Sequence, residues 1–211
     1  MANQTKYNQI LDALQTLLAK KNIQTISVSE IAQTAGIGKG SIYYYFPSKS
    51  AILEALIERS YQPSLMTARQ LTQQKDISPF TRMAQIFQAC RDSSRDFLSK
   101  DSQVSPLDER ERSFLHQKYL HHLITELKPD LTEIICQGIE RGEIHFDYPS
   151  ALSEIVLIVL TVKIDNTLLP SSREEIEDTI QGLISLLEKG TGNPSGSLNF
   201  LKDIEKAPAH A

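Results

Sequence analysis

The stretch that most constrains the fold is residues 27–49, with the sequence SVSEIAQTAGIGKGSIYYYFPSK. Ser27 and Glu30 have the spacing of a capping box, in which each side chain satisfies a free backbone N–H at the start of a helix. Apolar residues then recur at helical spacing as far as Gly36, where a left-handed backbone ends a helix without a steric penalty. These signals predict a short helix followed by a tight turn.

A second short helix is predicted over Gly38–Phe46, because Pro47 restricts the residue before it to extended conformations. Its apolar contacts are Ile42 and Phe46, which lie four residues apart and therefore on one face. The remaining faces carry Lys39, Gly40, Ser41, Tyr43, Tyr44 and Tyr45. Three consecutive tyrosines point in three directions around a helix, so a core on one side cannot bury them all. Two short helices joined by a turn containing glycine form the helix-turn-helix pattern.

Tyrosine hydroxyls and lysine ammonium groups contact phosphates and base edges, so the outward face of the second helix is predicted to bind DNA. The alternative is a buried helical hairpin with tyrosines in its core. At these residues the sequence resembles the tetracycline-repressor (TetR) family of bacterial regulators. The resemblance covers residues 1–60 and rests on Ile31-Ala32, Ala35-Gly36-Ile37, Lys39-Gly40-Ser41-Ile42-Tyr43, Tyr45-Phe46 and Pro47-Ser48-Lys49.

The resemblance implies particular roles for eight residues. The phosphate backbone would be held by Ser27, Lys39, Tyr43 and Lys49, and the major groove would be faced by Gly40, Ser41, Tyr44 and Tyr45. Two positions depart from the family pattern. Gly38 stands where the family often has a serine N-cap, and Asn22 stands where a glycine usually follows the first helix. Both residues still permit the expected turns, although Gly38 offers no side-chain contact to a phosphate.

Composition places the chain among ordinary globular proteins of one or two domains, with 211 residues, 40% hydrophobic and 23% charged. The longest apolar run, Ile155–Leu160, is too short to span a membrane, and the N-terminus has no signal-peptide pattern. We therefore expect a cytoplasmic protein without a membrane partner. Residues 1–60 carry six Lys or Arg and four Asp or Glu, although the whole chain has a net charge of −4. A mildly basic N-terminal segment fits a local DNA footprint that binds weakly as a single copy.

The periodicity predicts an all-α fold. We expect a helix-turn-helix DNA-binding domain over residues 1–48, a helical regulatory and dimerisation domain over 49–190, and a flexible tail over 191–211, in which residues 198–201 could dock as an apolar hook. Besides the two short helices, the expected helices are Tyr7–Lys20, Ser48 to about Gln70, one opening at Ser78-Pro79, Ser105–Leu127, Pro129–Gly142, Tyr148–Leu168 and Ser171–Gly190. The β-branched run Val156–Val162 is interpreted as a buried helix rather than a strand.

The last two helices are expected to form a homodimer interface. Ile155–Val162 is apolar around most of the helix, so every side of it needs covering, and Gly182 in the final helix allows close approach. The resemblance also implies that these two helices pair between copies. A purely internal core is the alternative. A two-fold dimer would present two recognition helices about 34–36 Å apart to a palindromic operator.

The predicted function is a ligand-controlled transcriptional regulator, most simply a repressor, whose partners are double-stranded operator DNA and a small-molecule effector bound among the C-terminal helices. Activation rather than repression is the other mode. Lys163, Asp165 and Asn166 are candidate polar anchors for the effector, although an exposed helix end explains them as well. The alternatives are an architectural DNA-binding protein without ligand control and an all-α enzyme. The sequence contains none of the nucleophile, phosphate-loop or metal motifs that an enzyme would need.

No metal or cofactor is expected. His116, His121 and His122 lack the i, i+4 spacing that places two imidazoles on one helix face, so we interpret them as solvated. Cys90 and Cys136 are interpreted as small buried hydrophobes in a reducing compartment.

Overall fold

The computed structural model describes residues 2–102, 109–163, 170–196 and 198–202, and no strand occurs among them. The helices are α1 (Ala2–Leu18), α2 (Val28–Thr34), α3 (Lys39–Tyr45), α4 (Lys49–Gln73), α5 (Pro79–Ser102), α6 (Glu109–Glu140), α7 (Pro149–Ile158) and α8 (Arg173–Gly190). A π-helical turn, η1, spans Val159–Lys163, and a 3-10 helix, η2, spans Asn199–Lys202. The expected all-α class is confirmed.

The chain divides into two compact units at places other than those expected. The first unit contains Met1–Tyr61 and Ser94–Tyr119, and the second contains Gln62–Ser93 and Leu120–Ala211. The expected boundary between residues 48 and 49 therefore falls inside the first unit, because the first turns of α4 share its core. Ile52, Leu53 and Ile57 of α4 are buried there, on the predicted apolar stripe.

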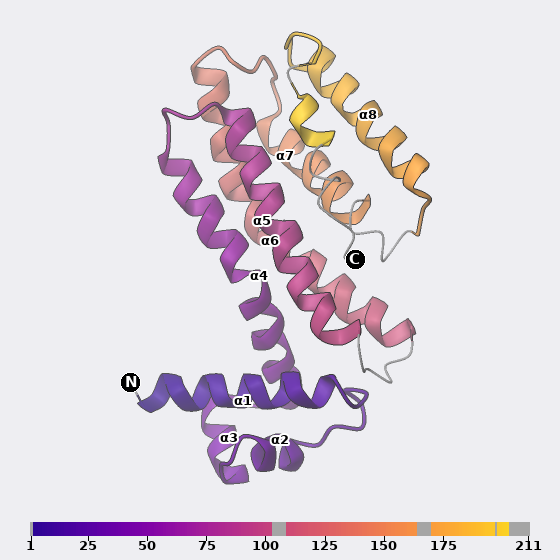
Figure 1. Ribbon diagram of the computed structural model, residues 1–211. Coiled ribbons are helices and arrows are strands. Elements are labelled where there is room, and N and C mark those ends of the chain that lie inside the picture. The colour runs from indigo at the N-terminus through magenta and orange to yellow at the C-terminus, as the bar shows by residue number, and fades with distance from the viewer. Residues whose placement is uncertain (1, 103–108, 164–169, 197, 203–211) are drawn as a thin grey trace. The chain divides into compact units, whose positions relative to one another are not determined.

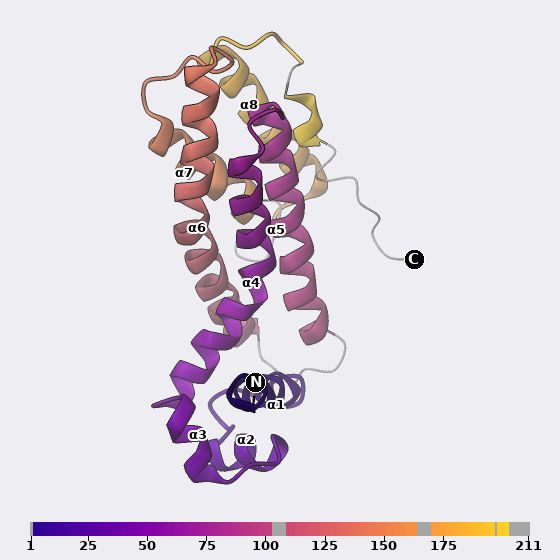
Figure 2. The same ribbon diagram turned by 90° about the vertical axis from the view of Figure 1, so that its left-hand side faces the viewer.

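Within the first unit, α1 lies across α2 and α3, as both views show (Figures 1 and 2). Its buried stripe contains Ile10, Leu11 and Leu14, in agreement with the predicted spacing. The helix begins at Ala2 rather than at Tyr7 and ends at Leu18 rather than Lys20. The buried residues of α2 and α3 include Ile31 and Ile42.

The boundaries of the two short helices follow the predicted signals. Ser27 caps α2, with its side chain accepting from the Glu30 N–H while the Glu30 carboxylate accepts from the Ser27 N–H. Gly36 has φ +67°, the left-handed conformation expected after α2. Gly38 caps α3 in an extended conformation without a side-chain hydrogen bond, and Phe46 is extended before Pro47. Local sequence therefore sets both helices and the turn between them.

In the second unit, stretches of α4, α5 and α6 run side by side (Figures 1 and 2). We expected a new helix to begin at Pro129, and this prediction is wrong: α6 continues through Pro129 without a break. A proline inside a helix costs about 3 kcal/mol. Leu127 and Leu131 are fully buried on either side of it, and burying two such side chains contributes about 3–6 kcal/mol, which outweighs that cost. The helix then stops before Gly142, which has φ +71°, as predicted. The expected start at Ser105 lies outside the described residues.

The expected helix over Tyr148–Leu168 is described only as far as Lys163. It consists of α7 followed by the π-helical turn η1, so Val156–Val162 is helical and not a strand. Ser172 caps α8 through a second capping box with Glu175, close to the predicted start. Helix α8 ends at Gly190, as expected. The left-handed glycine that follows it is Gly192, with φ +66°.

A buried arginine at the centre of the second unit was not predicted. Cys90 of α5 is buried as expected, and Phe87 is buried beside it. Arg82 is also fully buried, whereas Phe80 and Met83 are half-buried. Arg82 donates from Nη1 to the Leu71 carbonyl near the end of α4 and to the Gln137 side chain on α6. It thereby ties three helices together, and burial lowers the pKa of its guanidinium.

Residues 191–196 and 198–202 do not form the loose segment that we expected. Thr191, Leu198 and Leu201 are buried against the second unit, and η2 lies in this stretch. The predicted apolar hook at residues 198–201 is therefore docked. Residues 203–211 of the expected tail lie outside the described residues.

Candidate nucleic-acid interface

Helix α3 is held by its two apolar residues. Ile42 is 1% exposed and Phe46 4% exposed, and both belong to the core of the first unit. The Tyr7 ring of α1 packs on Phe46 with 4.8 Å between ring centroids. Since these anchors lie on one side of a seven-residue helix, the other side is fixed in orientation and points away from the core.

The outward side of α3 gathers the predicted contact residues on one uncovered surface. Tyr44 is 77% exposed and Tyr43 52% exposed. Lys39 and Gly40 are also exposed, while Ser41 and Tyr45 are half-buried. The Tyr44 and Tyr45 rings meet edge to face at 5.1 Å. We call this set, residues 39–41 and 43–45, the α3 surface.

Gly40 has open space around it. A Cβ added there would meet nothing within 4 Å, so packing within the described chain does not require a glycine at this position. Two large exposed aromatic rings on a short rigid helix are costly to leave in water unless a partner covers them. The α3 surface is therefore suited to approach by an external partner with polar and stacking groups.

Ser27 lies at the start of α2 and is exposed. Its oxygen accepts the Glu30 N–H at 3.2 Å, which leaves the hydroxyl proton for another acceptor. Glu30 is also paired with Lys21 at 2.6 Å. The Lys21 hydrogen bond and the Ser27 backbone N–H together hold the pKa of Glu30 down at about 2. Lys21 was not among the predicted site residues.

Lys49 differs from its predicted role. Its Nζ lies within hydrogen-bonding distance of three backbone carbonyl oxygens, 2.6 Å from Ile23, 2.8 Å from Ile26 and 3.4 Å from Gln24. An ammonium group has three donors, and all three are directed at this loop between α1 and α2. The side chain therefore holds the start of α4 to that loop, a contact that its predicted role did not include. Sequence spacing could not reveal this contact, because it joins residues that are 23 to 26 positions apart.

The other residues that the sequence analysis considered for chemistry are not part of the α3 surface. His116 is fully buried and stacks on Tyr119 at 5.9 Å, so the expected solvated position is wrong for this histidine. Lys163 donates to the Ser171 hydroxyl at 2.6 Å, and Asp165 and Asn166 lie outside the described residues. Burial raises the pKa of Cys90 to about 12, so its thiolate is not populated near neutral pH.

Within residues 2–102, 109–163, 170–196 and 198–202, no three His, Cys, Asp or Glu side chains are grouped to hold a metal ion. In the same part of the chain, every helix is too short or too polar to cross a membrane.

Two family matches cover most of the chain. Residues 10–56 match the family described as bacterial regulatory proteins of the tetR family. Residues 97–183 match the family described as the tetracyclin repressor-like C-terminal domain. The first match contains α2, α3 and the α3 surface.

Similar proteins share the N-terminal segment. The nucleoid occlusion factor SlmA of Haemophilus ducreyi is 40% identical over 58 residues, which is 27% of this chain and 29% of that protein. The transcriptional regulator EthR of Mycolicibacterium smegmatis is 47% identical over 49 residues, 23% of each protein. The chain thus matches less than a third of the length of these relatives. The crystal structure of RolR in complex with resorcinol has a similar fold, with a TM-score of 0.55 at 17% identity, covering 100% of this chain and 99% of RolR.

Proposed function

Because this chain belongs to the tetracycline-repressor family, we propose that it is a DNA-binding transcriptional regulator that responds to a small molecule, with repression as its mode. The observation that carries the proposal is the α3 surface, where exposed tyrosines stand on a helix anchored by Ile42 and Phe46. An enzyme would need a reactive cluster, whereas this surface carries groups that contact phosphates and base edges.

In this proposal the α3 surface enters the major groove. Lys39, Tyr43 and Ser27 contact the phosphate backbone, and Gly40, Ser41, Tyr44 and Tyr45 face the base edges. The uncovered side chains of Tyr43 and Tyr44 and the open space beside Gly40 support this assignment. Lys49 acts indirectly, by fixing the loop between α1 and α2.

We further propose that two copies pair through α7 and α8 and bind a palindromic operator. Ile155 and Ile158 on α7 are 51% and 45% exposed, and Leu186 on α8 is 73% exposed. A Cβ at Gly182 of α8 would meet nothing within 4 Å, which leaves room for a partner helix. Large apolar side chains exposed on two elements favour association with a second copy. Pairing also doubles the phosphate contacts of a weakly charged N-terminal segment.

The effector is proposed to bind within the second unit and to favour a conformation with lower operator affinity, which requires only that it prefer one of two states. The complex of RolR with resorcinol supports a small organic effector by analogy of fold. A ligand-independent DNA-binding protein is the second candidate, because one relative over the N-terminal segment is a nucleoid occlusion factor.

The test of DNA recognition uses Tyr44→Ala on operator duplexes that the wild-type protein selects from a random pool. Loss of a groove contact should lower affinity for the selected duplex by about 1–3 kcal/mol and leave affinity for a scrambled duplex unchanged. Gel-shift titrations of both duplexes at one salt concentration measure the difference. Equal loss on both duplexes would remove Tyr44 from base recognition, and unchanged affinity on both would remove the α3 surface.

A further inference from the structure

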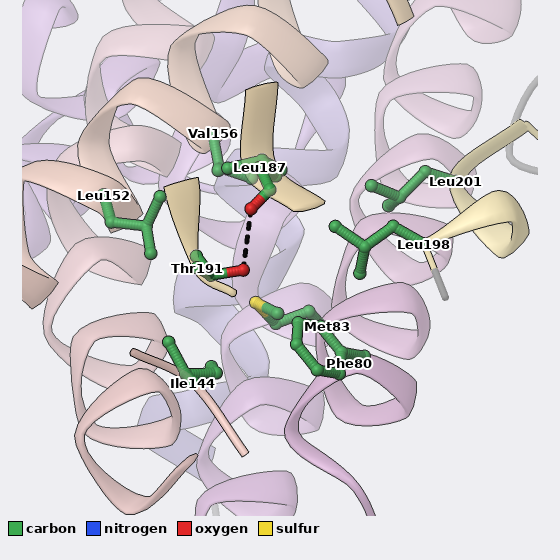
Figure 3. A pocket seen from close by; sticks show the side chains of 9 residues that line it. All are labelled: Phe80, Met83, Ile144, Leu152, Val156, Leu187, Thr191, Leu198 and Leu201. Atoms are coloured by element: carbon green, nitrogen blue, oxygen red, sulfur yellow. Dashed lines mark hydrogen bonds between the residues drawn. The ribbon is translucent and has the colours of Figure 1, made fainter. Parts of the chain in front are cut away.

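The second unit contains an apolar pocket, and none of the residues that line it is assigned to DNA binding (Figure 3). Its walls come from four elements, with Phe80 and Met83 from α5, Leu152 and Val156 from α7, and Leu187 from α8. Leu198, just before η2, and Leu201, within it, form another side, and Ile144 and Thr191 complete the lining. The empty space is about 380 Å³ when the open space at the mouth is included. Because that value includes open solvent, it does not describe enclosed space, and the enclosed part of the pocket is about 20 Å³. A ligand as large as one ring must therefore also occupy the mouth or displace side chains of the wall.

The pocket offers no free polar group to a ligand. Thr191 carries the one hydroxyl on the wall, and this hydroxyl donates to the Leu187 carbonyl at 2.7 Å (Figure 3). The same oxygen accepts from the Asn193 side-chain amide at 2.6 Å. Its single donor and one of its two lone pairs are therefore used within the protein. A charged ligand would lose its hydration without compensation in such a site, whereas an apolar ligand would not.

One wall of the pocket is held by a buried carboxylate. Glu188, near the end of α8, is 6% exposed. Its Oε1 accepts the N–H of Gly196 at 2.8 Å and the N–H of Leu198 at 3.0 Å. These two bonds fix the segment that places Leu198 and Leu201 over the pocket, where they are 1% and 2% exposed. Residues 198–201 are the hook predicted from the sequence.

We propose that this pocket is the effector site, that it binds a small uncharged apolar molecule such as a single ring or a short chain, and that Glu188 positions the hook as its wall. The proposal rests on the proposed ligand-responsive function and adds the ligand class and the residue that closes the site. A larger ligand would have to displace the hook.

The first experiment uses toluene as the probe and benzoate as its charged counterpart, with the full chain in each case. Toluene should raise the melting temperature of the wild type, and benzoate should not. Leu187→Phe fills the pocket and should weaken toluene binding about tenfold or more. Val156→Ile is a milder filling in case the first variant folds poorly. Met66→Phe enlarges an exposed residue of α4 outside the pocket and should leave toluene binding unchanged.

The second experiment tests the hook. Glu188→Ala should weaken toluene binding and speed hydrogen exchange at the Gly196 and Leu198 amides. Glu188→Gln should retain part of the toluene binding and part of the amide protection, because both N–H groups donate to one oxygen and glutamine keeps one oxygen acceptor. Glu177→Ala removes an exposed carboxylate of α8 and is the control. Unchanged toluene binding in Glu188→Ala with fast exchange at these amides would show that the hook is not a wall of the site.

Failure of the pocket and failure of the proposed function give different results. Equal stabilisation of wild type and Leu187→Phe by toluene, or none in either, would overturn the pocket assignment. A screen of small molecules for loss of operator binding is run on both proteins in parallel. An effector that acts equally on both would leave the regulator proposal intact and place its site elsewhere, whereas the absence of any effector would favour a ligand-independent DNA-binding protein.

Discussion

Lys39 begins α3, Lys49 begins α4, and the two lysines have different surroundings. Lys39 is exposed in the first turn of the helix, whereas the Lys49 ammonium group is directed at three carbonyl oxygens of the loop between α1 and α2. Hydrogen bonds from a charged donor to partly buried carbonyls contribute more to stability than exposed ones. In the proposed function, Lys39 therefore contacts DNA and Lys49 supports the fold.

We expect Lys49→Ala to lower the free energy of unfolding by about 1–2 kcal/mol, because three carbonyl groups lose their donor. Its effect on the salt dependence of DNA binding should be small. Lys39→Ala should have the opposite pattern, with unchanged stability and a salt slope lower by about 1 for each copy bound. Urea titrations and gel shifts at several salt concentrations measure both. A lower salt slope in Lys49→Ala alone would return this residue to the phosphate contacts.

Gly138 on α6 is a second residue whose role depends on close packing. A Cβ at this position would lie 2.8 Å from Ile144 Cδ1 and 3.0 Å from Pro79 Cγ. Gly138→Ala should therefore destabilise the protein by about 1–3 kcal/mol through overpacking. Gly190→Ala, where a Cβ meets nothing within 4 Å, is the matched control in urea unfolding. Equal stability of the two variants would mean that the Ile144 side chain adjusts freely.

At the scale of elements, the start of α2 depends on an ionised carboxylate. The pKa of Glu30 is held at about 2, below its ordinary value of 4.5, chiefly by the Lys21 hydrogen bond and then by Ser27. A carboxylate with a lowered pKa stabilises the folded state above its unfolded pKa and loses that contribution as the pH falls through the folded value. The capping box should therefore persist at pH 5 and weaken between about pH 4.5 and pH 2.

NMR spectra of the Ser27 amide between pH 7 and pH 2 measure this loss directly. The amide should report a transition with a midpoint near pH 2 in the wild type. Glu30→Gln keeps an oxygen acceptor for the Ser27 N–H and removes the titrating group, so the transition should disappear. A midpoint near 4.5 in the wild type would show that Lys21 does not hold the carboxylate.

At the scale of the whole molecule, operator binding should depend on pairing through α7 and α8. The double variant Ile158→Glu and Leu186→Glu places charges on two exposed apolar positions of these helices. Burying unpaired charges in an apolar interface is strongly unfavourable, so this variant should remain monomeric where the wild type forms a dimer. Its affinity for a palindromic duplex should fall toward that for a half-site, because each copy then makes only its own phosphate contacts.

Sedimentation velocity and gel shifts on palindromic and half-site duplexes check these expectations together. Met66→Glu adds a charge at an exposed residue of α4 and should remain dimeric. A double variant that stays dimeric would place the interface on other helices. A monomeric variant with full operator affinity would instead separate DNA binding from dimerisation.

Sequence alone determined the features that depend on neighbouring residues. The capping boxes at Ser27 and Ser172, the left-handed Gly36 and the helix end before Pro47 all arise within a few residues of chain, where backbone sterics and local hydrogen bonds decide the conformation. The apolar spacing of Ile42 and Phe46 likewise fixed which side of α3 faces outward.

The tertiary structure decided what depends on distant residues. Helix α6 continues through Pro129, and Arg82 and His116 are buried. The Lys49 ammonium group donates to carbonyl groups more than 20 residues away, and Glu188 accepts the N–H of Gly196 next to the hook. In each case packing or hydrogen bonding between separate segments outweighs a local preference, and no spacing rule along the chain reports that balance.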